Sequence, residues 1–327
     1  IETTDGAMRL VGTTLNAAGV DLVLKGIGVS QTSASKVFAS TAQVTAGAGS
    51  IDLSSALNDF TGQVTLTASG AAASIGDING LSLNSLTGKL AVTTSITAIA
   101  GTQLVLTPEN LTTTSGNIYL QSKDGNLTTP GTLTTTTGNV TLIGNFVTGS
   151  NGTVQVNQTI TTGSGAVTVS ADTEVILSKS VLSTSGNMTI SGATVTHSTG
   201  SLLDILYLRT GSAGSINVTA SGTGGLVMGQ YFYYQAGTGA TNVTSGGTVD
   251  LSHVTSSGVF NVSAVGQVQQ VGLGSSIAVN ALSVKTRSNG SISLANMSNN
   301  VAYVKLLSRN AADTAAGSGA ISYYDTN

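Results

Sequence analysis

A five-residue phrase recurs along the chain: a glycine, a small or polar residue, an aliphatic residue, a polar residue and a second aliphatic residue. Gly49–Leu53 and Gly62–Leu66 are two copies. Alternation of apolar and polar residues indicates a half-buried strand, and we interpret the leading glycine as a turn signal. A repeated strand-and-turn unit buries its apolar face only by stacking on its neighbours, so the pattern predicts a solenoid. Further copies start at Gly88, Gly116, Gly138, Gly152, Gly165, Gly186, Gly214, Gly247, Gly290 and Gly319.

The spacing of these glycines is uneven, at 13 residues from Gly49 to Gly62 and 28 from Gly186 to Gly214. A right-handed parallel β-helix tolerates such variation, and coils of roughly 20 to 28 residues would give about 12 to 16 turns. We therefore expect an all-β fold in which residues 1–327 form one continuous β-solenoid. Residues 1–48 should form more irregular coils, and we expect the chain to be a fragment of a longer repeat protein.

The aliphatic positions of the phrase should fill the interior of the coils, while threonine, serine and asparagine occupy outward positions and turns. Two distant segments are near copies: Gly49–Leu53 is followed by Asn58, and Gly290–Leu294 is followed by Asn299. The copies suggest that a larger repeat underlies the short phrase. The predicted interior residues are Ile51, Leu53, Val64, Leu66, Ile118, Leu120, Val140, Leu142, Val167, Val169, Met188, Ile190, Ile216, Val218, Val249, Leu251, Ile292 and Leu294.

The amino-acid composition disfavours several classes of function. With 11 Lys and Arg residues and a net charge of -3, the chain offers no basic patch, which disfavours nucleic acid as a partner. No run of residues approaches the roughly 18 to 20 apolar residues of a membrane helix, so we expect no membrane insertion of this segment. The absence of cysteine excludes disulfides and thiol catalysis. We expect no cofactor.

The best local pair of carboxylates is Asp172 and Glu174. A spacing of two would place both on one face of a strand, an arrangement that suits paired acid and base chemistry. Solvated outward side chains, with Lys179 nearby, are the simpler explanation of the pair. We expect no catalytic residue here and no enzyme activity.

His197 and His253 are the only histidines of the chain. Neither has a second histidine or a carboxylate at metal-ligand spacing, so we expect no metal site. Exposed strand or turn positions are the simplest expectation for both.

Four consecutive aromatic residues, Tyr231 to Tyr234, stand out in a chain that is only 4% aromatic. Alternation places Tyr231 and Tyr233 on one face and Phe232 and Tyr234 on the other. An exposed pair could stack on sugar rings, whereas the alternative is that one pair fills the interior and the other covers a loop. Tyr231 and Tyr233 are the candidate ligand-binding residues.

Several longer phrases resemble the shafts of large bacterial surface proteins of the filamentous-haemagglutinin type. They are Asn58–Gly62, Leu111–Leu120, Leu182–Ile190 and the segment from Asn310–Thr314 to Ile321–Tyr323. The resemblance covers most of the chain, from about residue 14 onward. It implies a right-handed β-helix, an extracellular location on the bacterial cell surface, and adhesion or a scaffold role. The chain has no Asn-Pro pair of the kind found in the secretion domain of that family, which leaves the export route open.

Three functions fit this sequence. The first is a non-catalytic adhesin shaft that attaches to cell-surface glycans or proteins through many weak contacts. The second is a structural subunit of a surface filament or layer, in which copies of the chain pack together. The third is a β-helix enzyme that degrades polysaccharides. The first is the expected function.

Overall fold

The computed structural model describes residues 1–68, 71–84, 89–92, 94–106, 110–129, 131–145, 152–198, 200, 204–272 and 274–326. These residues form parallel strands without a helix, stacked as a β-solenoid of about 12 turns. The all-β solenoid prediction is therefore confirmed. Gly88, the start of one copy of the phrase, lies outside the described residues. Among the residues described, no helix has the length and apolarity to cross a membrane.

The chain divides into two compact units, Ile1–Gly165 and Ala166–Asn327. The first unit contains the strands β1 (Met8–Leu10), β2 (Thr14–Gly26), β3 (Val29–Gln31), β4 (Lys36–Ala46), β5 (Ile51–Leu53), β6 (Asp59–Phe60), β7 (Gln63–Ala68), β8 (Ala73–Asp77), β9 (Leu81–Asn84), β10 (Lys89–Val92), β11 (Ile96–Ala100), β12 (Leu104–Leu106), β13 (Asn110–Thr113), β14 (Ile118–Ser122), β15 (Leu127–Thr129), β16 (Leu133–Thr135), β17 (Val140–Gly144), β18 (Thr153–Val156) and β19 (Ile160–Thr162).

The second unit contains β20 (Val167–Ala171), β21 (Glu174–Leu177), β22 (Val181–Ser183), β23 (Met188–His197), β24 (Leu206–Thr210), β25 (Ile216–Met228), β26 (Phe232–Ala236), β27 (Thr241–Ser245), β28 (Val249–Leu251), β29 (His253–Ala264), β30 (Val268–Gln270), β31 (Ser276–Thr286), β32 (Ile292–Leu294), β33 (Asn300–Ser308) and β34 (Ile321–Tyr323).

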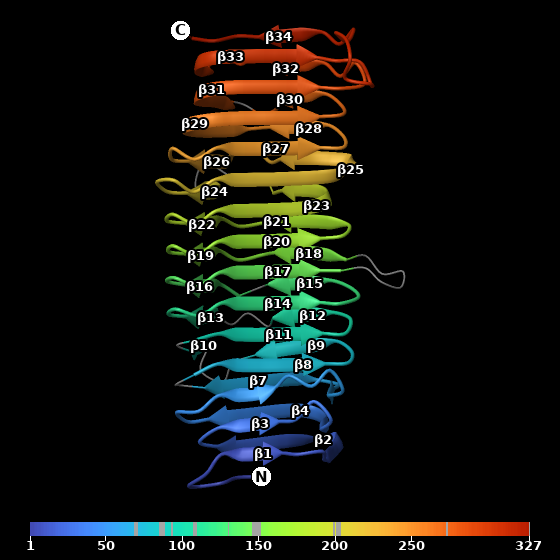
Figure 1. The fold of residues 1–327 in the computed structure, drawn as a ribbon, viewed down its shortest axis with the longest axis vertical. Helices are drawn as coiled ribbons and strands as arrows, with labels where there is room; N and C mark the ends of the chain where they lie inside the picture. The colour runs from blue at the N-terminus through green and yellow to red at the C-terminus, as the bar shows by residue number, and fades with distance from the viewer. Residues whose placement is uncertain are drawn as a thin grey trace. The chain divides into compact units, whose positions relative to one another are not determined.

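From β8 onward in the first unit, strands three apart in sequence pair in parallel and in register, so each of these coils has three faces. Nearer the N-terminus the long strands β2 and β4 each extend past a corner, and the pairs are β1–β3, β2–β4 and β3–β5. On one face β8, β11, β14 and β17 lie one above another (Figure 1). Ile96 is opposite Ile118, and Ile118 is opposite Val140, so each step is 22 residues. Like residues thus stack in ladders, and every predicted interior residue is at most 1% exposed. Parallel crossovers are right-handed in nearly all proteins, which favours the predicted hand.

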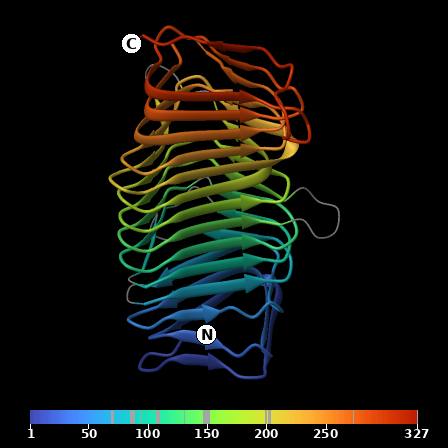
Figure 2. The same ribbon diagram turned by 45° about the horizontal axis from the view of Figure 1, so that its top comes forward.

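The second unit is built in the same way, but several strands bend from one face onto the next. Strand β29 pairs through His253–Ser256 with β26 and through Phe260–Ala264 with β27. Its register with β31 shifts between Ser256 and Val259, which marks the corner. Figure 2 shows these strands, drawn from yellow to red, running side by side in one direction. The side chains just before and just after the corner therefore face different sides of the unit.

The glycines that lead the phrase are needed for close packing between coils. A Cβ added at Gly138 would lie 1.9 Å from the Gly116 carbonyl oxygen, and one at Gly165 would lie 1.7 Å from that of Gly138. None of these three glycines has a positive φ. The interpretation of the leading glycine as a turn signal was therefore incomplete, because its missing side chain is what lets successive coils approach.

Not every threonine faces outward as expected. Thr113, Thr135 and Thr162 end their strands with buried side chains. The Thr162 hydroxyl donates to the Gly165 carbonyl at 2.8 Å, and that of Thr135 donates to the Gly116 carbonyl at 3.2 Å. These hydroxyl groups satisfy carbonyls at the tight corners, where buried backbone groups need partners.

The near copies in the sequence fold into the same buried network. Asn58 and Asn299 are both 0% exposed. The amide of Asn58 exchanges two hydrogen bonds with Gln31, and the amide of Asn299 exchanges two with Gln270. Each asparagine also accepts from one backbone N–H and donates to two backbone carbonyls. The shared network supports the larger repeat suggested by the sequence.

Candidate functional site

The aromatic run Tyr231–Tyr234 lies at the start of strand β26 in the second unit, with Tyr231 just before the strand and the other three residues in it. Phe232 and Tyr234 are 0% exposed, while Tyr231 and Tyr233 are half-buried at the surface. The expected alternation between faces is therefore present, with Phe232 and Tyr234 in the interior of the coil. Tyr231 and Tyr233 form the outward pair.

On the inner side, His197 holds β26 in place. Its Nδ1 lies 3.2 Å from the Val227 carbonyl oxygen and its Nε2 lies 3.2 Å from the Tyr234 hydroxyl. Because the carbonyl can only accept, Nδ1 carries the proton and Nε2 accepts from Tyr234. The His197 ring also packs edge-on against Phe232 at 4.4 Å between centroids. Burial lowers the pKa of His197 to about 4, so the ring is neutral at physiological pH.

On the outer side, four aromatic rings from three neighbouring coils come together. We call Tyr207, Tyr231, Tyr233 and His253 the outer aromatic patch. Tyr207 is opposite Tyr233 on the next coil, and Tyr233 is opposite His253 on the coil after that. The rings of Tyr233 and His253 stack at 4.1 Å with 4° between their planes, and Tyr231 stacks on His253 at 6.4 Å. Tyr207 lies 5.5 Å from Tyr233.

Tyr231 adopts a backbone conformation that is unusual for its residue type. Its φ is 58°, in the left-handed region that a bulky side chain rarely occupies. The Tyr231 carbonyl accepts from Leu206 N–H at 3.1 Å, so the neighbouring coil fixes this conformation. Strain of this kind costs about 1–3 kcal/mol and tends to occur at functional sites. Here it places the Tyr231 ring alongside His253.

Polar groups border the patch. The Arg209 guanidinium lies 5.5 Å from the centre of the Tyr207 ring, within the range of a cation–π contact. Arg209, Gln235 and Thr255 form the next outward row along the strands. Burial and the neighbouring tyrosines raise the pKa of Tyr233, so its hydroxyl stays protonated and able to donate at neutral pH. Apolar rings beside amide, hydroxyl and guanidinium groups are suited to a ligand that is itself amphipathic.

The structure corrects the expectation that both histidines are exposed, since His197 is 1% and His253 is 5% exposed. His253 Nδ1 lies 3.2 Å from the Ser276 hydroxyl, whereas its Nε2 is buried without a hydrogen-bond partner among the described residues. The Tyr233 ring covers His253, a contact that depends on coil register. Within the described part of the chain, no three His, Cys, Asp or Glu side chains gather as a group that could hold a metal ion.

The two carboxylates do not share one strand face as the spacing predicted. Asp172 lies in the bend after β20, and Glu174 is the first residue of β21. Glu174 accepts a hydrogen bond from the Thr196 hydroxyl at 2.9 Å. Lys179 forms an ion pair with Asp204 at 2.7 Å. The corner between β20 and β21 breaks the two-residue period on which the prediction relied.

The fold and the patch together define a β-solenoid that carries a cluster of aromatic rings on its surface. Comparisons of the chain with protein-family models, with curated proteins and with solved structures return no match.

Proposed function

We propose that this chain is a non-catalytic segment of an extracellular bacterial adhesin, a shaft that attaches to cell-surface glycans through the outer aromatic patch. The observation that carries the proposal is the parallel stack of Tyr233 on His253, flanked by Tyr231 and Tyr207. The resemblance of the sequence to filamentous-haemagglutinin-type shafts supports the cell-surface location.

The chemistry of the patch favours a sugar over a purely apolar ligand. Because the rings stack on one another, their outer edges and hydroxyl groups face the ligand, and Arg209, Gln235 and Thr255 supply further partners for sugar hydroxyl groups. Rigid tyrosine side chains lose little conformational entropy on binding. A single patch of this size binds weakly, and several copies on one cell surface would add strength by multivalency.

The test is retention of the purified chain on a panel of immobilised bacterial and host polysaccharides. Retention by at least one glycan is expected, and Tyr233→Ala or Tyr231→Ala should abolish it. Tyr119→Ala is the matched control, because Tyr119 is an outward tyrosine of β14 in the first unit, away from the patch residues in sequence. Loss of retention in the control as well would contradict the proposed site.

The same incubation separates the other two functions. New reducing ends that disappear in Asp172→Asn or Glu174→Gln would make the chain a polysaccharide-degrading enzyme and overturn the proposal. Absence of both retention and cleavage would favour a structural subunit of a surface filament or layer.

A further inference from the structure

The outer face of the second unit carries a groove that is distinct from the aromatic patch. Its cavity volume is about 380 Å³, within the range of ligand pockets in proteins. The groove lies over β27, the second halves of β29 and β31, and β33. The corner of β29 separates it from His253, which lies in the first half of that strand. Its lining side chains include Asn242, Thr244, Asn261, Ser283, Lys285 and Lys305.

A ladder of amide groups forms one side of the groove. Asn217, Asn242 and Asn261 are opposite one another on three successive coils. Asn242 Nδ2 donates to Asn217 Oδ1, and Asn261 Nδ2 donates to Asn242 Oδ1, both at 2.9 Å. Each amide nitrogen carries two hydrogens, and the ladder uses one of them. The second N–H of Asn242 and of Asn261 makes no hydrogen bond to a described residue, which leaves a row of donors for a ligand.

The outward row of side chains that contains the asparagine ladder extends over two further strands and ends at a lysine. Asn261 is opposite Ser283, and Ser283 is opposite Lys305. In the neighbouring outward row, Ser263 is opposite Lys285. The two lysines are therefore diagonal neighbours on adjacent strands, a separation of about 7–8 Å between backbones that long side chains can bridge. An anionic group between them would contact both ammonium groups.

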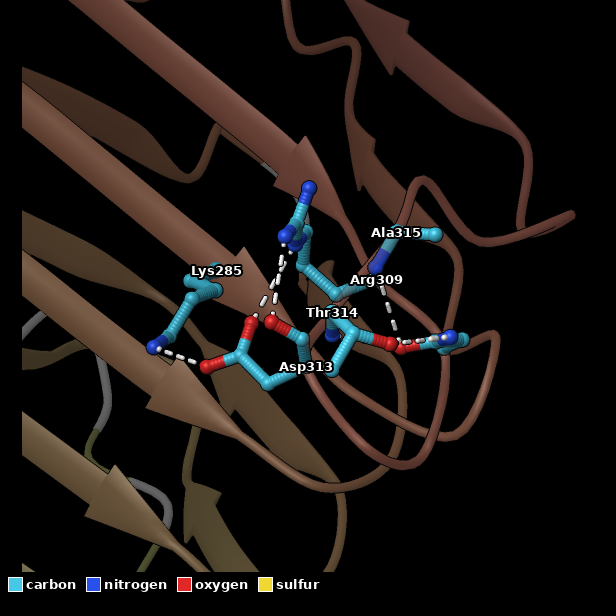
Figure 3. A network of polar contacts seen from close by, with 6 residues as sticks. Lys285, Arg309, Asp313, Thr314 and Ala315 are labelled. Carbon is cyan, nitrogen blue, oxygen red and sulfur yellow. Dashed lines mark hydrogen bonds and ion pairs between the residues drawn. The ribbon is translucent and has the colours of Figure 1, made fainter.

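A short loop holds Lys285 at the rim of the groove. Lys285 Nζ lies 2.8 Å from Asp313 Oδ2, and Arg309 Nε lies 3.2 Å from Asp313 Oδ1 (Figure 3). Asn310 Oδ1 accepts from the backbone N–H of Thr314 at 2.9 Å, which closes the loop on itself. Hydrogen bonds from Lys285 and Arg309 lower the pKa of Asp313. The carboxylate therefore stays ionised and keeps both cations in place.

Positive charge exceeds negative charge around this groove. Residues 285, 287, 305 and 309 are four of the 11 basic residues of the chain, and no Asp or Glu occurs between Asp250 and Asp313. Asp313 offsets one of these charges. Lys305 is exposed and has no ion-pair partner in the part of the chain that the structure describes. A negatively charged group on a ligand could form an ion pair with Lys305.

We infer that this groove binds an acidic saccharide, one whose rings carry carboxylate or sulfate groups. The amide ladder and the hydroxyl groups of Thr244, Ser263 and Ser283 would bind the sugar hydroxyls, and Lys285 and Lys305 would bind the anionic substituent. Charge-assisted hydrogen bonds are the stronger ones, so the lysines would provide most of the selectivity. This site is independent of the aromatic patch, and either can fail without the other.

The test uses the whole chain and three labelled tetrasaccharides, measured by fluorescence polarisation at low and high salt. Hyaluronan supplies carboxylate alone, keratan sulfate supplies sulfate alone, and chitotetraose is neutral. We expect at least one acidic probe to bind more tightly than the neutral probe and to weaken at high salt. Binding of one acidic probe identifies the anionic group, and binding of both means that the charge alone is recognised.

Variants locate the site. Lys305→Gln should lower the affinity for the acidic probe by about tenfold, as expected for loss of one charged contact. Asn261→Ala should also weaken it, whereas Lys179→Gln, an equal change of charge outside the groove, should not. Tyr233→Ala should leave acidic binding intact, which separates this site from the patch. The inference is overturned if no acidic probe exceeds the neutral one, if Lys305→Gln binds like the unaltered chain, or if Lys179→Gln is equally weakened.

Discussion

The side-chain amides of Gln31 and Asn58 bind one another reciprocally, with both N–O distances at 2.9 Å, although the two residues are 27 positions apart. The Asn58 oxygen also accepts from Val37 N–H at 3.0 Å. Because the pair lies on successive coils, it fixes their register from within. The same pairing recurs between Gln270 and Asn299 in the other unit.

Removing this asparagine should destabilise the protein strongly. Asn58→Ala leaves Gln31 Oε1 and the Val37 N–H buried without partners, while Gln31 Nε2 keeps its hydrogen bond to the Ser35 carbonyl. Each group left without a partner costs about 1–3 kcal/mol. We expect a loss of about 3 kcal/mol or more in the free energy of unfolding, measured by urea denaturation, and a similar loss for Asn299→Ala. Asn217→Ala, which removes a half-buried amide, should cost about 1 kcal/mol. Equal effects of all three would contradict a special role for the buried pairs.

The glycines of the phrase should not tolerate a methyl group. Gly138→Ala would place a Cβ 1.9 Å from the Gly116 carbonyl oxygen, so the coils must separate. We expect a loss of about 2 kcal/mol or more in unfolding free energy. Gly6→Ala is the control, since nothing lies within 4 Å of the added carbon, and its stability should be unchanged or slightly raised. A neutral Gly138→Ala would contradict close packing as the reason for the repeat.

Stability should fall in acid because of His197. Burial lowers its pKa from 6.5 to about 4, so the unfolded chain binds a proton at higher pH than the folded chain does. The folded state therefore loses stability as the pH falls from about 6.5 towards 4, by roughly 2–3 kcal/mol between pH 7 and pH 4.5. His197→Gln cannot titrate and should lack this part of the loss. Urea denaturation of both forms at the two pH values measures the difference.

The titration of Asp77 changes the stability with pH in the opposite direction to that of His197. Burial raises its pKa from 3.8 to about 6, so its contribution to stability is present below about pH 4 and is lost as the pH rises through 6. Both the unaltered chain and His197→Gln contain Asp77, so its effect cancels in the comparison. If the two proteins have the same dependence on pH, the neutral buried state of His197 is wrong.

The strain at Tyr231 can be measured by comparing two substitutions that both remove the ring. Tyr231→Gly and Tyr231→Ala differ in backbone freedom, and glycine adopts a φ of 58° without a steric penalty. We expect the glycine variant to be more stable than the alanine variant by about 1 kcal/mol in thermal or urea unfolding. Both should lose glycan retention. An alanine variant that is the more stable of the two would show that the position is not strained.

Alternation along the chain was enough to predict the buried ladders, because every second residue of a strand faces the core. Ile118 and Val140 illustrate this, since both follow a glycine by two residues and stack on one another. The position of Gly138 was predicted but its physical role was not, since the approach of the Gly116 carbonyl is a contact between coils.

Contacts between coils could not be predicted, because they depend on coil lengths that vary. Tyr207 and Tyr233 are 26 residues apart, while Tyr233 and His253 are 20 apart, yet all three stack in one column. The period of the strand breaks at each corner, which is why Asp172 and Glu174 do not share a face. The amide ladder escaped prediction for the same reason, with Asn217, Asn242 and Asn261 spaced unevenly along the chain.

The most direct test of glycan binding at the aromatic patch is an NMR titration of the chain labelled with ¹³C at its tyrosine rings. The titrant is a saccharide taken from the polysaccharide retained in the panel. We expect the resonances of Tyr207, Tyr231 and Tyr233 to shift in a saturable way, and those of buried Tyr234 and of Tyr119 in the first unit to stay unchanged. Shifts confined to other tyrosines, or no shift with any saccharide of the panel, would contradict it.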